Sequence, residues 1–107
     1  MNARRTFRKS LSGNGRFRRP LGSHGKLKGL RSGLVALKPG ESVGEHNTGL
    51  KEEVLVILKG RAAIYCAKRR ISAQRNTFVY VPPKCRHNVK NIGAGPLKYV
   101  YITSRSG

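Results

Sequence analysis

Short apolar stretches alternate with turn signals through residues 33–107. The stretches cover residues 34–37, 54–58, 62–67, 78–81 and 97–103, and segments that contain Gly, Pro or Asn separate them. β-branched and aromatic residues are frequent in these stretches, as they are in strands, and no ten-residue window free of Gly and Pro has a helical period. The pattern predicts six or seven strands at intervals of about ten residues, and therefore a small all-β barrel or sandwich.

Two of these stretches also predict which side chains share a face. Residues 97–103 alternate between two faces, one of which begins with Lys98 and is more polar at its start. Residues 54–58 are apolar on both faces, which is typical of a strand inside a barrel or sandwich. If Glu52 and Glu53 belong to this strand, their side chains must point in opposite directions.

Residues 1–32 differ in composition from the rest of the chain. They contain ten basic residues, no acidic residue and five glycines. Their few apolar residues follow neither a helical period nor the alternation of a strand. Such a segment buries too little apolar surface to offset the entropy of ordering, so we expect it to be disordered alone in water. The sequence therefore predicts a basic tail over residues 1–32 and a barrel domain over residues 33–107. The ten basic residues are Arg4, Arg5, Arg8, Lys9, Arg16, Arg18, Arg19, Lys26, Lys28 and Arg31.

The whole chain carries 23 Lys and Arg against four acidic residues, which gives a formal net charge of +19. Residues 33–107 hold 13 of the basic residues and all four Glu, so the positive charge extends beyond the tail. A solvated surface normally mixes both signs, and this imbalance therefore favours a polyanionic partner. The densest group, Lys68, Arg69 and Arg70 with Arg75 nearby, is predicted to lie on a hairpin between strands.

The charge pattern favours an RNA-binding structural protein. A basic, glycine-containing extension on a small domain resembles the extensions of ribosomal proteins. This resemblance implies a ribosomal or other ribonucleoprotein component, with rRNA and neighbouring ribosomal proteins as partners. The ten basic residues of the tail, together with Lys68, Arg69, Arg70 and Arg75, are the predicted RNA contacts. DNA is less favoured, because the pattern contains no helix that could enter a major groove.

Location is predicted from the apolar runs and the cysteines. The longest apolar run, residues 54–58, is too short to span a bilayer, and no apolar stretch of signal-peptide length follows the basic start. Cys66 and Cys85 are predicted to be free, buried thiols of an intracellular protein. We therefore expect a cytoplasmic, ribosome-associated protein. A mitochondrial location is the alternative, because an Arg- and Ser-rich, acid-free start resembles a transit peptide, although five glycines and Pro20 interrupt any amphipathic helix.

Two stretches carry residues with metal-binding chemistry. The first keeps Gly40, His46, Glu53 and Gly60 at set spacings, with Thr48 two residues after the histidine. The second contains Asn76, Pro82, Lys84, His87 and Asn91. Both stretches resemble the paired motifs of the cupin superfamily, with seven of the ten motif positions kept. Thr48 stands where the family has a second histidine, and Asn76 and Lys84 replace two glycines.

The resemblance implies a small β-barrel of the jelly-roll type with a metal site inside. His46, Glu53 and His87 would be the remaining ligands, and two imidazoles with one carboxylate suit Zn, Mn, Fe or Ni. The resemblance thus offers an alternative function, a metal-dependent cupin enzyme or sugar-binding protein with a small molecule in the barrel. Two further interpretations stay open: the histidines are buried without a metal, or Glu45 or Glu52 serves as a general base. No catalytic residue is assigned from the sequence, and no cofactor is required.

Overall fold

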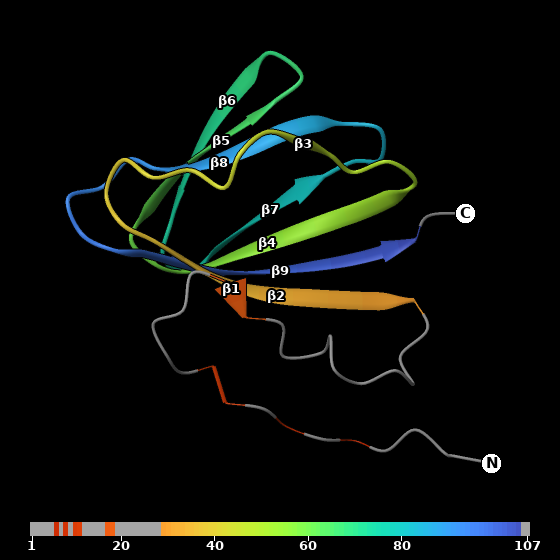
Figure 1. Cartoon of the computed structure of the whole chain (residues 1–107), viewed down its shortest axis with the longest axis horizontal. Helices are drawn as coiled ribbons and strands as arrows, with labels where there is room; N and C mark the ends of the chain where they lie inside the picture. The colour runs from red at the N-terminus through yellow and green to blue at the C-terminus, as the bar shows by residue number, and fades with distance from the viewer. Residues whose placement is uncertain (1–5, 7, 9, 12–16, 19–28, 106–107) are drawn as a thin grey trace.

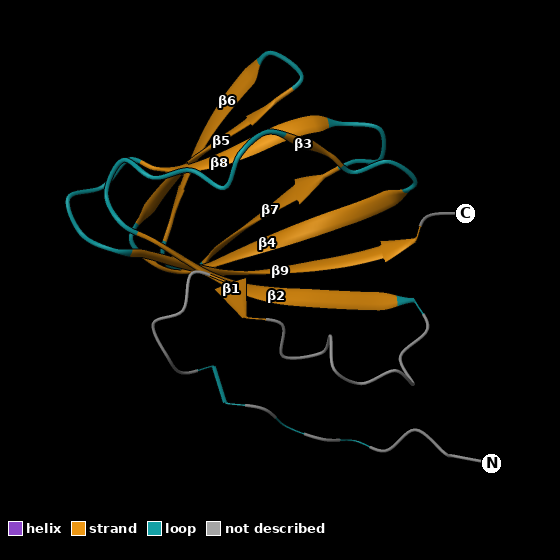
Figure 2. Cartoon of the chain, in the orientation of Figure 1, coloured by secondary structure: helices purple, strands orange, loops and turns teal. Residues whose placement is uncertain are grey.

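The computed structural model describes residues 6, 8, 10–11, 17–18 and 29–105. These residues form strands and no helix (Figure 2). The strands are β1 (Phe17–Arg18), β2 (Leu30–Leu37), β3 (His46–Asn47), β4 (Lys51–Lys59), β5 (Arg61–Cys66), β6 (Arg69–Gln74), β7 (Thr77–Val81), β8 (Arg86–Asn91) and β9 (Leu97–Arg105). Within the described part of the chain, no helix has the length and hydropathy to cross a membrane.

The strands form two antiparallel sheets that pack against each other (Figure 1). One sheet has the order β1-β2-β9-β4-β7, and the other has the order β3-β8-β5-β6. β9 lies in the middle of the first sheet, where it pairs with β2 on one side and with β4 on the other. The prediction of a small all-β barrel is confirmed.

The hydrophobic core lies between the two sheets and is built from alternate residues of their strands. Its fully buried members are Val35, Leu37, Leu55, Ile57, Ala62, Ile64, Val89 and Leu97. Burial of each large aliphatic side chain stabilises the fold by about 1.5–3 kcal/mol. Because side chains alternate along a strand, the residues between these core positions point outward, and most of them are partly or fully exposed.

The inner face of the first sheet changes from apolar to polar along its strands. Leu37 lies opposite Leu97 at the apolar end. Towards the other end, Thr103 lies between Arg31 on β2 and Glu53 on β4. The interior of the barrel is therefore closed by aliphatic packing at one end and lined by polar groups at the other.

Gly60 connects β4 to β5 at a point where a side chain has no room. Its backbone has a φ of +89°, and a Cβ atom would collide with the carbonyl oxygen of Pro96 and lie 2.9 Å from the Cα of Leu97. Glycine is the residue that adopts this conformation without a steric cost. The second glycine of the first cupin-like motif is thus explained by the backbone and not by ligand chemistry.

The N-terminal segment contains pairing that the sequence analysis did not anticipate. β1 and the first three residues of β2 fall within residues 1–32, and Phe17 of β1 lies opposite Val35 of β2. β2 is otherwise an edge strand, whose unpaired backbone groups provide a template for another strand. Seven predicted RNA contacts lie outside the described residues: Arg4, Arg5, Lys9, Arg16, Arg19, Lys26 and Lys28.

Cys66 and Cys85 form a disulfide, so the prediction of two free thiols is wrong. β5 and β8 are neighbours, and Cys66 lies opposite His87 in their register. This pairing brings the chain at Cys85 close to Cys66, with 6.4 Å between the two Cα atoms. The bridge ties the end of β5 to the loop that leads into β8.

Candidate metal centre

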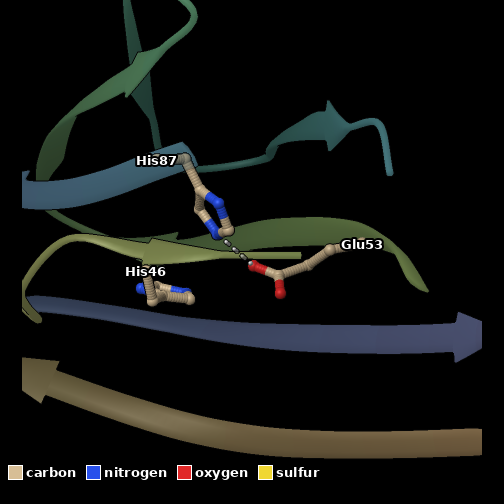
Figure 3. Close-up of side chains that lie close together, drawn as sticks. All are labelled: His46, Glu53 and His87. Carbon is tan, nitrogen blue, oxygen red and sulfur yellow. Dashed lines mark ion pairs between the residues drawn. The ribbon is translucent and has the colours of Figure 1, made fainter. Parts of the chain in front are cut away.

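His46, Glu53 and His87 come together between the two sheets, as the cupin-like motifs implied (Figure 3). His46 in β3 lies directly opposite His87 in β8, and the centroids of their rings are 4.0 Å apart. Glu53 reaches the pair from β4 in the facing sheet. One ligand atom from each residue lies within 4.8 Å of the other two, which is close enough for a single ion to contact all three.

Both imidazole rings are oriented by backbone carbonyl groups. Nδ1 of His46 lies 3.0 Å from the carbonyl oxygen of Gly44, and Nδ1 of His87 lies 3.1 Å from that of Cys85. A carbonyl oxygen only accepts hydrogen bonds, so each Nδ1 must be the donor and carry the proton. In the neutral rings, Nε2 then carries the lone pair. This is the tautomer in which Nε2 binds a metal ion.

The Nε2 atom of His87 is buried and lacks a hydrogen-bond partner among the described residues. It lies 3.5 Å from Oε2 of Glu53, which is longer than an ordinary hydrogen bond. A lone pair that faces a carboxylate oxygen at a buried position is unfavourable unless positive charge lies between or beside them. A second proton on the ring supplies that charge, and so does a metal ion held by both groups.

The electrostatics of His87 show that the site favours a cation. Burial lowers the pKa of this imidazole, but the Glu53 carboxylate and the Cys85 carbonyl outweigh burial and raise the pKa above its ordinary value. The surroundings that stabilise the imidazolium form present negative charge and oriented dipoles to the ring. The same groups would stabilise a divalent cation in place of the proton.

Strand alternation places Glu53 inside the barrel and Glu52 outside, as predicted. Glu53 is 8% exposed, whereas Glu52 is on the outer face, where its Oε1 accepts a hydrogen bond of 2.7 Å from the hydroxyl of Tyr80. Glu52 therefore does not reach the site as a base. Glu45 lines the cavity, but its Oε1 is 2.6 Å from Nε of Arg86, which holds the carboxylate in an exposed ion pair.

Thr48, in the position of the missing histidine, has a structural role. Its hydroxyl donates to the carbonyl oxygen of Pro82 at 2.7 Å and accepts from the backbone N–H of Cys85 at 2.9 Å. These bonds link the loop after β3 to the loop between β7 and β8. They also fix the segment that supplies the carbonyl group for His87. The centre thus has three side-chain ligands, and Thr48 positions one of them.

Asn91, the last residue of the second motif, also has a structural role. Its Nδ2 donates to the carbonyl oxygens of Leu37 and Gly95 at 3.0 and 2.9 Å, and its Oδ1 accepts from the N–H of Gly93 at 2.9 Å. One buried amide therefore satisfies three backbone groups of the β8–β9 loop and β2.

A cavity of about 560 Å³ opens beside the three candidate ligands. Tyr99, Tyr101 and Thr103 of β9 line it, and Arg31 and Lys51 add two positive charges where the inner face is polar. Arg31 was predicted to contact RNA as part of the tail, yet it lies in β2 and lines this cavity. Lys51 and Tyr101 are not among the functional residues that the sequence predicts. Lys51 precedes Glu53 by two residues, so strand alternation alone would have placed both on one face.

The cations predicted to contact RNA on the barrel lie apart from this centre. Lys68, Arg69 and Arg70 are on the exposed hairpin between β5 and β6, as expected, and Arg75 is exposed in the turn that follows β6. None of these four residues lines the cavity beside His46 and Glu53.

The comparisons with known proteins agree with this geometry. A family model for the cupin domain matches residues 33–103. The chain is 33% identical over 73 residues to an uncharacterized protein of Methanocaldococcus jannaschii. The aligned region covers 66% of this chain and 58% of that protein. The chain spans 58% and 48% of the lengths of the two curated relatives it matches.

Solved structures show the same fold at lower identity. A cupin protein from Bacteroides fragilis superposes with a TM-score of 0.81 and 19% identity, over 97% of this chain and 88% of that one. A predicted oxalate decarboxylase from Thermotoga maritima superposes with a TM-score of 0.68 and 20% identity, over 71% of this chain and 66% of that one. Because the family model covers most of the chain, this protein belongs to the cupin family.

Proposed function

We propose that this protein is a metal-dependent small cupin that acts on a small molecule bound in its barrel. His46, Glu53 and His87 hold one divalent ion from the group Zn, Mn, Fe and Ni. The observation that carries the proposal is the buried Nε2 atom of His87, which faces the Glu53 carboxylate without a hydrogen-bond partner among the described residues. A metal ion in contact with both atoms would remove this mismatch.

The donor set suits such an ion. Two neutral imidazoles and one carboxylate are common ligands for these metals, and three protein ligands leave coordination positions for a substrate. The bound ion would supply a Lewis acid beside the cavity. The carbonyl groups of Gly44 and Cys85 hold the imidazoles ready, so little rearrangement is needed when the ion binds.

The cavity favours a substrate that carries negative charge. Arg31 and Lys51 line its polar end, while the Glu53 carboxylate would be neutralised by the metal. A carboxylate or phosphate group could lie between these cations, with the rest of the molecule against Tyr99 and Tyr101. The likeness to a predicted oxalate decarboxylase supports an enzymatic role for the cupin barrel over a purely structural one.

Metal binding is tested by comparing variants of two adjacent glutamates, Glu53, which points into the barrel, and Glu52, which points outward. Metal-free protein is titrated with Zn²⁺ and with Mn²⁺ in a calorimeter, and elemental analysis measures the bound metal. We expect one ion per wild-type chain. The Glu53→Gln variant should lose at least tenfold in affinity. Glu52→Gln, the matched control on the outer face, should bind as the wild type does.

Equal affinity of the two Gln variants would contradict the assignment, and so would the absence of a bound ion in the wild type. The substrate class is then tested on the metal-loaded protein with malonate as a dicarboxylate probe. Arg31→Gln and Lys51→Gln should each weaken malonate binding severalfold while the metal content stays constant. Unchanged malonate binding in both variants would reject an anionic substrate, even if the metal site is confirmed.

A further inference from the structure

The acidic residues of the chain all lie in one segment before the β5–β6 hairpin, and none of them forms an ion pair with Lys68, Arg69 or Arg70. All four Glu lie between residues 41 and 53, and residues 54–107 hold eleven Lys and Arg with no acidic residue. Glu53 is inside the barrel, Glu52 accepts from Tyr80, and Glu45 pairs with Arg86. The carboxylate nearest the hairpin, that of Glu45, is thus engaged with Arg86, and the positive charge of Lys68, Arg69 and Arg70 is left unpaired.

The hairpin presents its cations around a hollow of about 310 Å³. Lys68, Arg69, Arg70 and Arg86 line this hollow together with Tyr65 and Glu45. Lys68, Arg69 and Arg70 are exposed and form no ion pair among the described residues. Tyr65 is 39% exposed and lies opposite Arg70 in the strand register, so an aromatic ring and a guanidinium group share one face.

The shape of the hairpin exposes this hollow. Ala67 and Lys68 form the turn in left-handed conformations, with φ angles of 50° and 68°. β6 is the last strand of its sheet, and the hairpin extends beyond the body of the barrel (Figure 1). Residues of this turn line the hollow, so a long partner can reach it from solvent at the tip of the hairpin.

We propose that this hollow, the hairpin cleft, binds single-stranded nucleic acid, a function separate from the metal centre. Phosphate groups would contact Lys68, Arg69 and Arg70, and a base would stack on Tyr65. Proteins that bind single strands combine a positive groove with exposed aromatic rings in this way. The described residues contain no helix that could read a duplex groove, and the turn carries no large apolar side chain that could enter a bilayer.

Binding is measured by fluorescence anisotropy of the full chain with labelled U12 RNA and dT12 DNA at several salt concentrations. Replacing Lys68, Arg69 and Arg70 with Gln should weaken binding at least tenfold at 150 mM salt and reduce the salt slope by about two units. Tyr65→Ala should weaken binding about five- to a hundredfold, whereas Tyr65→Phe retains the ring and should bind normally. The matched control replaces three exposed lysines elsewhere, Lys38, Lys59 and Lys90, with Gln.

The control should lose less than threefold in affinity, because it has the same net charge as the hairpin variant but an intact cleft. Equal losses in the two triple variants would overturn the proposal in favour of diffuse attraction to the whole chain. Binding to phosphatidylserine vesicles but to neither oligonucleotide would also overturn it. Tighter binding of U12 than dT12 would identify RNA as the partner, and the reverse order would identify DNA. Glu53→Gln should leave all of these affinities unchanged, which separates this test from that of the metal.

Discussion

Replacing Thr48 with Val tests whether this residue holds the metal centre in place. Valine has nearly the same shape but no hydroxyl, so the N–H of Cys85 loses its acceptor and the carbonyl of Pro82 loses its donor. Cys85 is 5% exposed, and an unsatisfied buried donor costs about 1–3 kcal/mol. The Pro82 carbonyl is only partly buried, and loss of its hydrogen bond adds about 1 kcal/mol. We therefore expect the free energy of unfolding to fall by about 2–4 kcal/mol.

The assay is urea unfolding of metal-free protein with the disulfide intact, followed by circular dichroism because the chain has no Trp. Thr48→Ser is the matched control, since it retains the hydroxyl and removes one methyl group, at a cost of about 1 kcal/mol. The Val variant should also bind Zn²⁺ about 10- to 100-fold more weakly, because the Cys85 carbonyl that orients His87 is displaced. The reasoning is refuted if the Val variant unfolds within about 0.5 kcal/mol of the wild type, or if Ser costs as much as Val.

Three further predictions concern the disulfide, the imidazole and the β4–β5 turn. The Cys66–Cys85 disulfide closes a loop with a sequence separation of 19, so its reduction should lower the free energy of unfolding by about 3 kcal/mol. The affinity for Zn²⁺ should also fall. Unchanged affinity after reduction would show that the disulfide does not position His87. In metal-free protein, the pKa of His87 is higher in the folded state than its ordinary value of 6.5. This difference stabilises the fold fully at pH values below 6.5, and the stabilisation is lost as the pH rises through the folded-state pKa. Urea unfolding between pH 5 and 9 should show this decline in the wild type and a weaker one in Glu53→Gln; identical profiles would exclude Glu53 as the cause. Gly60→Ala should cost at least about 2 kcal/mol in thermal or urea unfolding, while Gly95→Ala, where nothing lies within 4 Å of a Cβ atom, should be nearly neutral.

The three candidate ligands could be predicted because each lies in a short stretch that resembles a cupin motif, and the spacing within each motif is a local property of the chain. Turn residues on either side limit the strands, so the fold class follows from the pattern. Strand alternation separates Glu52 from Glu53, and the resemblance to the cupin motif then indicates which of the two points inward. The same reasoning could have placed Lys51 beside Glu53, two residues away on one strand.

Features that depend on pairing between distant strands could not be predicted in this way. The disulfide requires Cys66 of β5 to lie opposite His87 of β8, and nothing within either stretch specifies that register. The role of Thr48 is similar, because its partners Pro82 and Cys85 are more than thirty residues away. Composition could not reveal that β1 pairs with β2, because two residues carry no periodicity.

The central position of β9 has a consequence for how the site is assembled during folding. β9 joins β2 to β4 within the first sheet, and all of its pairing partners lie far away in sequence. Loop-closure entropy must therefore be overcome before this sheet gains its contacts, which makes such pairing slow. Until β9 is inserted, β4 has no partner on that side, and Glu53 has no fixed position opposite the histidines. The metal centre is thus expected to form late, so its capacity to bind an ion reports that the whole barrel has closed.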